Sequence, residues 1–462
     1  MTLPPLTAHT PHMFRERFPF LVVTVLALSW LATSATAQAP SSRFPDIVIV
    51  TIDTLRSDRL SSYGYERPTS PRIDALVDAG VRFTEARVPE PLTAPSMISM
   101  VTSLYPHEHG TSRNGLRMRP DLLSLPKILK KRRYHTAAFI SNWTLKDELS
   151  GLGEHFDEYH EVFTRKRWYV FADEATGDDV TAEALGWLGG YAKQDDRRPF
   201  LLWAHYVEPH EPYRLHEEFA ERLGIDTDGK VPVSDRYDTE IAFVDRSVGN
   251  LLDGVEKILG PSSAKPLILF ASDHGESLGE HGYWGHGRHL YEPTLHIPMS
   301  ITWEGRLEPR TLDAPASLLD LTPTVFGLLD LPVHPAFQGI DWTPVLRGNA
   351  EPNMDRVTYH QAHKGAVQRS GNQNARRQGL LEVGQVEHGQ KEILRVTNDK
   401  HWLFDLTKDP KELANKASGD PSAELHQWLE KVREGLASSD ALPPAELDEE
   451  AIEKLRALGY ID

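Results

Sequence analysis

Polar side chains that can bind a metal follow two predicted β-strands far apart in the sequence. Asp53 comes directly after the β-branched run at 46–52, and Asp273 and His274 follow the apolar run at 267–271. Carboxylate oxygens and an imidazole nitrogen are suitable ligands for Mg²⁺, Ca²⁺, Mn²⁺ or Zn²⁺. Either Asp alone would be interpreted as a helix cap, but two acids with an imidazole favour a site for one divalent cation.

A hydroxyl group that could act as a nucleophile lies in the segment 92–97. Pro95 suits the first turn of a helix, where its missing N–H costs nothing, so Thr93 is expected at or just before the N-cap. Free N–H groups and the positive end of the helix dipole favour a developing alkoxide there. An ordinary capping role for Thr93 is the alternative that this segment alone leaves open.

Four apolar runs predict the strands that position these groups. They lie at 46–52, 136–140, 200–204 and 267–271, and a helical pattern at 237–258 falls between the last two. Continuous β-branched and apolar runs are typical of strands that are buried on both faces of a parallel sheet. We therefore predict a doubly wound, mostly parallel α/β domain with its ligand site outside the carboxyl ends of the strands.

The pattern changes after about residue 348. The region 351–390 is polar and indicates a long loop or a hairpin. Short strands and helices are expected at 393–396, 401–404, 423–436 and 446–458. We therefore place a catalytic domain at 45–348 and a smaller α+β domain at 349–462.

The first residues of the chain have the pattern of a secretory signal. Arg15 and Arg17 precede an apolar stretch at 18–32, and Ala35-Thr36-Ala37 offers a small-x-small cleavage site. The stretch is shorter than the ~20 residues of a membrane-spanning helix. We expect a signal peptide at 1–37, a spacer at 38–44, and a secreted or periplasmic protein with no stable membrane span after cleavage. An uncleaved anchor is the alternative.

Composition excludes several classes of protein and site. The 462 residues include 50 Lys and Arg against 67 Asp and Glu, a net charge of −17, which disfavours binding to a nucleic-acid backbone. The chain has no cysteine, so disulfides, zinc–thiolate sites, iron–sulfur clusters and a cysteine nucleophile are excluded. Any metal must therefore be bound by oxygen atoms and imidazole.

Six motifs, in this order along the chain, resemble the sulfatase branch of the alkaline phosphatase superfamily. They are DTLRSD (53–58) with SYGY (62–65), TAPSM (93–97) with YPHEHG (105–110), HYVEPHEPY (205–213), SDHGESLGEHG (272–282), DLTPT (320–324) and LFDLTKDP (403–410). The resemblance implies one metal bound by the strand-end acids, a nucleophile at a helix start, and basic groups around the anionic oxygens of an ester. It also implies the small C-terminal domain.

Several positions depart from the sulfatase pattern. Authentic sulfatases carry Cys or Ser at the position of Thr93, oxidised to formylglycine, and Arg at the position of Met97. The Cβ of threonine bears a methyl group, so its oxidation would give a ketone and not the aldehyde whose hydrate lets a sulfatase expel sulfate. Thr54 stands where a second acid is usual, and the Lys-x-His pair is absent from the region 140–143.

Threonine at the nucleophile position is similar to nucleotide pyrophosphatases/phosphodiesterases and to phosphoglycerol or phosphoethanolamine transferases of the same superfamily. This similarity implies that Asp53, Thr93, Asp273 and His274 bind the metal, and that a group passes through a Thr93 ester. We predict an exported, metal-dependent hydrolase of small anionic sugar, lipid or aryl esters, with phosphate favoured over sulfate. The alternatives are an arylsulfatase-type enzyme without formylglycine and a non-catalytic carbohydrate- or lipid-binding relative. Hydrolase versus transferase stays open.

Three further side chains are candidates for the site. Glu208 and His210 follow the strand predicted at 200–204, and His286 follows closely after Asp273. In the first alternative, Glu208, His210 and His286 bind a second metal that activates the hydrolytic water. In the second, His210 and His286 donate hydrogen bonds to the ester and supply the general acid for the leaving group. In the third, these side chains have structural roles.

Overall fold

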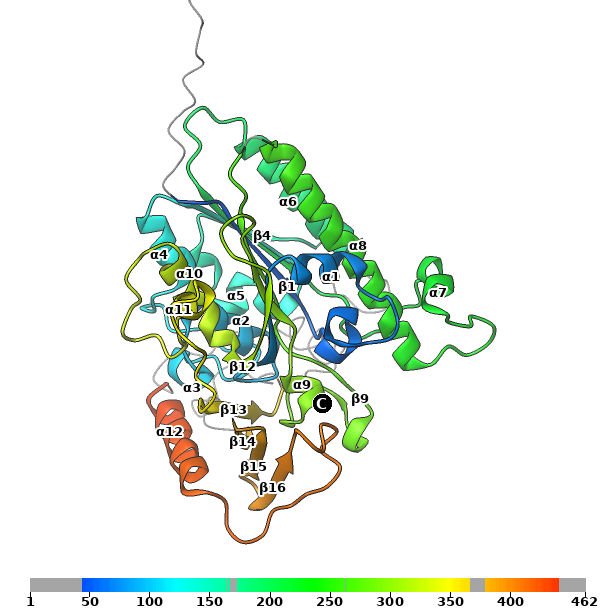
Figure 1. Cartoon of the computed structure of the whole chain (residues 1–462), viewed down its shortest axis with the longest axis vertical. Helices are drawn as coiled ribbons and strands as arrows, with labels where there is room; N and C mark the ends of the chain where they lie inside the picture. The colour runs from blue at the N-terminus through cyan, green and yellow to red at the C-terminus, as the bar shows by residue number, and fades with distance from the viewer. Residues whose placement is uncertain (1–43, 164, 167–172, 262, 366–378, 440–462) are drawn as a thin grey trace, which may run out of the picture. The chain divides into compact units, whose positions relative to one another are not determined.

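An eight-stranded sheet organises the part of the chain that the structure describes (Figure 1). The computed structural model describes residues 44–163, 165–166, 173–261, 263–365 and 379–439. The strand order is β12-β2-β11-β8-β1-β7-β3-β4, and in this sheet only β11 runs antiparallel to its neighbours. The predicted α/β fold class is confirmed.

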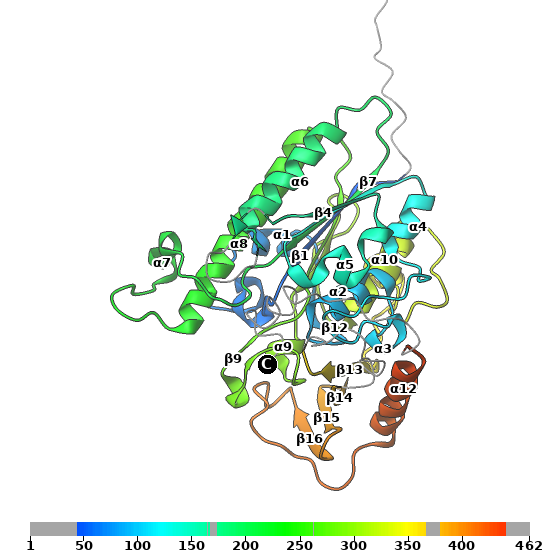
Figure 2. The ribbon, with the colours of Figure 1, turned by 180° about the vertical axis from the view of Figure 1, so that it is seen from behind.

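Helices cover both faces of this sheet. The strands are β1 (Ile47–Ile52), β2 (Val81–Arg87), β3 (His135–Ile140), β4 (Glu158–Glu161), β7 (Phe200–Tyr206), β8 (Leu267–Ser272), β11 (Met299–Thr302) and β12 (Arg310–Ser317). On one face lie α1 (Pro71–Asp78), α6 (Gly177–Tyr191) and α8 (Val233–Leu259), and on the other α2 (Thr93–Thr102), α4 (Leu125–Lys131) and α10 (Leu321–Leu328) (Figures 1 and 2). All four strands and the helix predicted from apolar runs are present.

Strand β1 shows why an uninterrupted apolar run predicted a strand of this sheet. Val48, Val50 and Ile52 pack into the core beneath α1, α6 and α8, whereas Ile47 and Ile49 pack into the core on the opposite face. None of these side chains is more than 2% exposed. A strand covered on both faces needs apolar residues at every position, so polar and apolar residues do not alternate.

A four-stranded antiparallel sheet follows the large one in the sequence. Its strands are β13 (Thr358–His363), β14 (Leu380–Glu387), β15 (Gln390–Arg395) and β16 (Lys400–Asp405), and α12 (Ala423–Ser439) packs against it. The strands and the helix predicted at 393–396, 401–404 and 423–436 correspond to β15, β16 and α12. The polar region 351–390 contains all of β13 and β14, which pair antiparallel as the hairpin alternative predicted.

The remaining elements are short. They include α3 (Pro106–His109), α5 (Asp147–Ser150), α7 (Glu217–Leu223), α9 (Glu292–Leu295), α11 (Thr343–Leu346), the pair β5 (Arg165–Lys166) and β6 (Asp173–Glu174), and the pair β9 (Ser277–Leu278) and β10 (Trp284–Gly285). The domain boundary predicted after residue 348 falls between α11 and β13 and stays a prediction. The predicted signal peptide at 1–37 and the predicted helix at 446–458 lie outside the described residues. Within the described ranges, no helix has the length and apolar character needed to cross a membrane.

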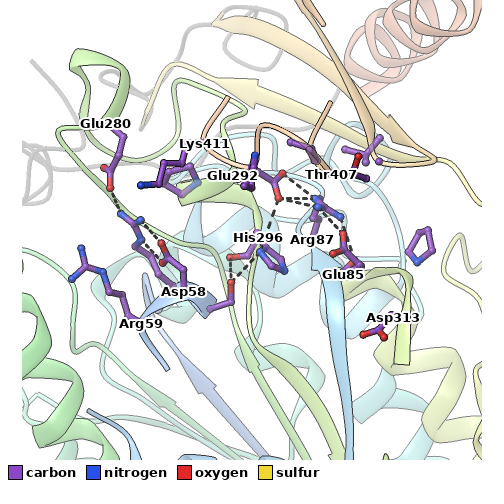
Figure 3. A pocket seen from close by; sticks show the side chains of 18 of the residues that line it. Asp58, Arg59, Glu85, Arg87, Glu280, Glu292, His296, Asp313, Thr407 and Lys411 are labelled. Carbon is purple, nitrogen blue, oxygen red and sulfur yellow. Dashed lines mark hydrogen bonds and ion pairs between the residues drawn. The ribbon is translucent and has the colours of Figure 1, made fainter. Parts of the chain in front are cut away.

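A buried cluster of charges joins the C-terminal sheet to the rim of the large sheet. Lys391 Nζ lies 3.0 Å from Glu292 Oε1 and 2.8 Å from Glu412 Oε1. Arg87 Nη2 lies 2.8 Å from Glu292 Oε2 (Figure 3). Burial alone would raise the pKa of the Glu292 carboxyl, but the charges of Arg87 and Lys391 overcome this effect and hold that pKa well below its usual range.

Replacing Lys391 with methionine is expected to destabilise the protein strongly. The Lys391 side chain is 1% exposed, and its removal leaves two buried carboxylates with less compensating charge, which costs about 3–5 kcal/mol in comparable sites. Denaturant unfolding of the two proteins measures this difference. Lys408→Met is the matched control: Lys408 is 79% exposed in its pair with Asp405, so its loss should change the free energy of unfolding by less than about 1 kcal/mol.

Candidate active site

Asp53 and Asp273 lie side by side at the carboxyl ends of neighbouring strands. Strands β1 and β8 pair in parallel with Ile52 opposite Ser272, and the two acids are the next residues of each strand. Both side chains are fully buried. The structure thus places the two acids on one rim of the sheet, where the sequence predicted them.

Each of these carboxylates has one oxygen bound by the protein and one oxygen free of such bonds. Asp53 Oδ2 accepts a hydrogen bond from Asn142 Nδ2. Asp273 Oδ1 accepts from the backbone N–H of Thr54 (3.0 Å) and of His274 (2.7 Å). Asp53 Oδ1 and Asp273 Oδ2 are buried and accept no hydrogen bond from a described residue.

The imidazole of His274 faces the two free oxygens. Its Nδ1 lies 2.9 Å from the carbonyl oxygen of Gly275, which can only accept, so Nδ1 carries the proton and Nε2 presents a lone pair. His274 Nε2 is 3.4 Å from Asp273 Oδ2, 3.8 Å from Asp53 Oδ1 and 3.3 Å from Thr93 Oγ1. Four potential ligand atoms therefore converge on one point.

The geometry and the charges of this cluster fit a divalent cation. One ligand atom from each of Asp53, Asp273 and His274 lies within 4.8 Å of the others, a span that bonds of about 2.0–2.4 Å can bridge. Burial, and then the charge of Asp273, raises the pKa of Asp53 well above its usual range. Burial also raises the pKa of Asp273. A cation would stabilise both carboxylates in their charged form.

Burial favours the neutral form of His274, His210 and His286. Burial lowers the pKa of His274 to about 4 and that of His210 to about 4, and it lowers the pKa of His286 well below its usual range. Neutral imidazole is the form that binds a metal. Neutral imidazole also has one N–H to donate, so a neutral histidine can act as a hydrogen-bond donor through the ring nitrogen that carries the proton.

Helix α2 begins at Thr93, and its first turn is fastened to the end of β8. Leu92 takes the N-cap position with extended backbone angles, so Thr93 is the first helical residue, one position further into the helix than predicted. Ser96 Oγ donates to the carbonyl oxygen of Asp273 (2.5 Å). Asn114 Oδ1 accepts from the backbone N–H of Ala94 (3.0 Å). These contacts hold the Thr93 hydroxyl against the acidic pair.

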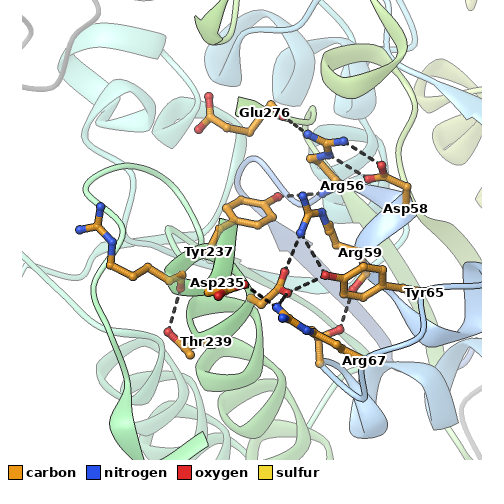
Figure 4. Close-up of polar contacts among 12 residues, drawn as sticks. Arg56, Asp58, Arg59, Tyr65, Arg67, Asp235, Tyr237, Thr239 and Glu276 are labelled. Carbon is orange, nitrogen blue, oxygen red and sulfur yellow. Dashed lines mark hydrogen bonds and ion pairs between the residues drawn. The ribbon is translucent and has the colours of Figure 1, made fainter. Parts of the chain in front are cut away.

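The loop that follows Asp53 is anchored to helix α8 (Figure 4). Tyr237 donates its hydroxyl hydrogen to the carbonyl oxygen of Thr54 (2.6 Å) and accepts from the backbone N–H of Arg56 (3.1 Å). Arg56 Nη1 in turn donates to the carbonyl oxygen of Glu276 (3.0 Å), so the segments that carry Asp53 and His274 are tied together. Thr54 has a φ of 54°, which is uncommon for a β-branched residue and directs its N–H at Asp273.

His210 and His286 meet beside His274. Their Nε2 atoms are 3.2 Å apart, and the ring of His286 stacks on that of His274 at 4.4 Å. His210 Nδ1 lies 2.7 Å from the carbonyl oxygen of Glu211 and therefore carries a proton. His210 Nε2 is then the acceptor of the pair, and His286 Nε2–H is the donor.

Glu208 points elsewhere. Its Oε1 accepts from the backbone N–H of Gly177 (3.0 Å), the first residue of α6, so it stabilises the start of that helix. Burial, and then the charge of Glu240, raises the pKa of Glu208 to about 7. Among the described residues, Glu208, His210 and His286 form no group close enough to share a metal. The second metal site of the first alternative stays a prediction.

Comparison with known proteins identifies the family. The sequence profile of the sulfatase family matches residues 45–331, which is more than half of the chain. The chain belongs to the sulfatase family. A second profile, for the C-terminal region of N-sulphoglucosamine sulphohydrolase, matches residues 279–438. The resemblance predicted from the six motifs is confirmed, and the chain is a sulfatase-family hydrolase.

Similar proteins and structures span most of this sulfatase-family chain. An N-acetylglucosamine-6-O-sulfatase of Bacteroides thetaiotaomicron is 23% identical over 91% of each chain, and a choline-sulfatase of Rhizobium meliloti is 24% identical over 81% of this chain and 82% of that one. A structure in complex with D-glucosamine-2-N,6-O-disulfate has a TM-score of 0.66 at 20% identity, covering 87% of this chain and 100% of the other. The phosphonate monoester hydrolase of Agrobacterium radiobacter has a TM-score of 0.64 at 19% identity, covering 86% and 96%. These structural likenesses show a shared fold.

Asn142 and Asn114 lie in the site of this sulfatase-family enzyme but were not predicted from the sequence. Asn142 lies in the region that lacks the Lys-x-His pair, and it binds Asp53. Asn114 is fully buried beside the start of α2, and its Nδ2 has no hydrogen-bond partner among the described residues. The sequence signal was misleading, because Asn114 followed by Gly115 is typical of a turn. Met97, at the position of the usual arginine, is fully buried in the core.

Proposed function

We propose that this enzyme hydrolyses small anionic esters through Thr93, and that phosphate or phosphonate esters are better substrates than sulfate esters. The observation that carries the proposal is the position of Thr93 Oγ1, 3.3 Å from His274 Nε2 and next to the two acids that expose free oxygens. A threonine in this place cannot form the aldehyde of a sulfatase, but its hydroxyl can form an ester. The likeness to the phosphonate monoester hydrolase supports this reading.

A divalent cation held by Asp53, Thr93, Asp273 and His274 would lower the pKa of the hydroxyl and offset charge on the oxygens of the ester. Thr93 Oγ would then release its proton to solvent and bond to phosphorus while the bond from phosphorus to the leaving oxygen breaks. The electron pair would stay on the leaving oxygen, which takes up a proton from water. His286 Nε2–H, now hydrogen-bonded to His210, is placed to donate to the leaving oxygen. Water would next attack phosphorus and bond to it while the bond from phosphorus to Thr93 Oγ breaks, and Oγ would take up a proton released by that water.

Asn114 is proposed to bind a non-bridging oxygen of the transferred group. Its Nδ2 is a buried donor without a described partner, and such a donor is stabilised when an anionic oxygen fills the space before it. Because Asn114 Oδ1 accepts from Ala94 N, the amide is held in one orientation relative to Thr93.

Asn114→Asp should therefore lower kcat/KM by roughly 10²–10³-fold, because the loss of one preorganised donor costs about that much. The carboxylate keeps the acceptor for Ala94 N and replaces the donor by a repelling oxygen. Steady-state kinetics with each ester measures the effect, and thermal unfolding checks the fold. Unchanged kcat/KM in a folded Asn114→Asp protein would remove Asn114 from the site.

The proposal is tested with four types of ester that share one leaving group. Purified protein is assayed with Mn²⁺, Zn²⁺, Ca²⁺ or Mg²⁺ against p-nitrophenyl phosphate, its phosphodiester, its phosphonate and its sulfate. We expect kcat/KM for the best phosphorus ester to exceed that for the sulfate by at least ~10²-fold, a difference of about 3 kcal/mol in transition-state binding. The opposite preference would support direct hydrolysis of sulfate esters, in line with the names of the curated relatives.

Export is part of the same proposal. It rests on the signal pattern at 1–37, which lies outside the described residues. Mass spectrometry of the protein isolated from its native cells should show a mature chain that begins after Ala37. An intact N-terminus in that preparation would favour the anchor alternative.

A further inference from the structure

Strand β13 of the C-terminal sheet runs beside the segment that leads to Thr93. It is an edge strand of its sheet, on the side of the large sheet (Figures 1 and 2). His360 Nδ1 donates to the carbonyl oxygen of Val88 (2.8 Å), and the backbone N–H of Gln361 donates to that of Pro89 (2.9 Å). The two segments therefore advance together, and the end of β13 reaches the last residues before helix α2.

The side chain of Glu90 joins these two segments. Its carboxylate accepts from Gln361 Nε2 (3.0 Å) and from His363 Nδ1 (2.9 Å), and all three side chains are fully buried. Glu90 lies three residues before Thr93, and its carbonyl oxygen accepts from the N–H of Leu92 (2.9 Å) in a tight turn. His363 is therefore fixed against the turn from which the helix of the proposed nucleophile begins.

The end of β13 is also attached to the loop that carries Asn114. Arg113 Nε donates to the carbonyl oxygen of Gly365 (3.1 Å), two residues after His363. The next residue of that loop, Asn114, accepts from the backbone N–H of Ala94 in the first turn of α2. His363 is thus held from two sides by segments that contact the start of α2.

The second ring nitrogen of His363 has no hydrogen-bond partner among the described residues. A carboxylate can only accept, so His363 donates the proton on Nδ1 to Glu90, and Nε2 of the neutral ring presents a lone pair. This Nε2 is buried, and so is the unpartnered Nδ2 of Asn114. A buried polar atom without a partner is destabilising, and a ligand that supplies the partner removes that penalty. A fixed acceptor and a fixed donor therefore belong to segments that contact the start of α2.

We propose that His363 is a specificity-determining residue that binds the alcohol part of the substrate, and that Glu90 is the residue that positions it. A lone pair repels an anionic oxygen, so His363 Nε2 does not share the role of the Asn114 amide. Nε2 instead accepts a hydrogen bond from a hydroxyl group on one of the two carbons next to the ester carbon. The preferred substrates are therefore esters of alcohols that carry such a hydroxyl. This inference rests on the proposed hydrolysis of esters at Thr93.

Two esters of matched shape test this specificity. One is a glyceryl ester attached through a terminal carbon, and the other is an alkyl ester in which methyl groups replace both free hydroxyls. Both are made with the acid that gives the best substrate among the four ester types. For the native enzyme, kcat/KM should be higher for the glyceryl ester by roughly 10–10²-fold, because the alkyl ester leaves a buried acceptor without a partner. Equal values for the two esters would overturn the proposal.

The variant His363→Asn separates substrate binding from folding. Its amide can take the place of Nδ1 and donate to Glu90, but it has no atom at the position of Nε2. We expect kcat/KM for the glyceryl ester to fall by roughly 10–10²-fold and that for the alkyl ester to stay within about 3-fold of the native value. An equal fall for both esters would mean a structural role for His363 and would overturn the proposal.

The matched control is His155→Asn. His155 is also fully buried, its Nδ1 lies 2.8 Å from Ser124 Oγ at the N-cap of α4, and its Nε2 has no partner among the described residues. Since His155 is attached to α4 and not to the turn before α2, this change should leave the ratio of the two kcat/KM values as it is in the native enzyme. A loss of the preference in this variant as well would remove the assignment to His363.

Nitrogen NMR of the imidazole rings tests the role of Glu90 without any substrate. The signal of His363, identified by its loss in His363→Asn, should be that of the Nδ1–H tautomer in the native protein. In Glu90→Gln, Gln361 still donates to the oxygen at position 90, so the new amide nitrogen faces His363 Nδ1 and should move the ring proton to Nε2. The Nε2–H tautomer in the native protein, or no change in Glu90→Gln, would overturn the positioning role.

The outcomes also separate this inference from the proposed function. Thr93→Ala should remove the activity on both esters, whatever their ratio in the native enzyme. If Thr93→Ala lost this activity but the native enzyme treated the two esters alike, only the role of His363 would be wrong. If Thr93→Ala kept full activity, the proposed function would be wrong.

Discussion

Replacing Thr93 with alanine should lower kcat/KM by at least about 10⁴-fold on the best ester, because the nucleophile of a covalent mechanism is lost. The fold should persist, since the only described hydrogen bond of the Thr93 side chain is the 3.3 Å contact with His274. Bound metal should remain, because Asp53, Asp273 and His274 are intact. Steady-state kinetics, elemental analysis and thermal unfolding measure the three outcomes.

Two further variants control this experiment. Thr93→Ser keeps the hydroxyl and should retain activity within about 10–10²-fold, whereas Thr93→Ala should not. Thr102→Ala removes another buried threonine hydroxyl of the same helix, which donates to the carbonyl oxygen of Ile98, and should leave kcat/KM unchanged. Full activity of Thr93→Ala would refute the nucleophile assignment. Mass spectrometry of protein quenched during turnover should find phosphate on the peptide that carries Thr93.

The parts of the site that could be predicted are those attached to regular elements. Asp53 and Asp273 were placed on one rim because apolar runs identified their strands as parallel, and parallel strands end on the same edge. His274 followed from its neighbour. For Thr93, the segment by itself favoured an ordinary capping role, and only the family resemblance favoured a nucleophile.

The parts that could not be predicted depend on loops and on buried polar contacts. Asn114 and Asn142 reach the site from loops whose paths no periodicity reveals. Strand β13 lacks apolar alternation because its polar residues are buried against another polar side chain: Gln361 and His363 both bind Glu90, at 3.0 Å and 2.9 Å. Glu208 was predicted near the metal because it follows β7, and the structure shows that one oxygen of its carboxylate accepts from the start of α6, a contact that the sequence did not reveal.

Asp53→Asn should abolish metal-dependent activity and at the same time stabilise the metal-free protein. In the native chain two buried carboxyl groups face each other, and burial together with the charge of Asp273 raises the pKa of Asp53 well above its usual range. Without metal, ionising both groups therefore opposes folding at neutral pH. An amide at position 53 removes one charge and keeps an acceptor for Asn142.

Thermal unfolding in EDTA and in added Mn²⁺ measures the stability of the metal-free and the metal-bound protein for each variant. The native protein should gain stability from the metal by mass action, about 2.7 kcal/mol at 100 times the dissociation constant, and Asp53→Asn should gain little or none. Asp245→Asn is the control. Asp245 is buried, but it accepts hydrogen bonds from the backbone N–H groups of Arg72 and Ile73, far from the site. The gain in stability of this variant on adding metal should equal that of the native chain. A metal-free Asp53→Asn protein less stable than the native one would mean that Asp53 is held by its bond to Asn142 as an ordinary structural acid. If Asp53→Asn lowers the activity and also raises the stability of the metal-free protein, the Asp53 carboxylate serves to bind a cation and not to stabilise the fold.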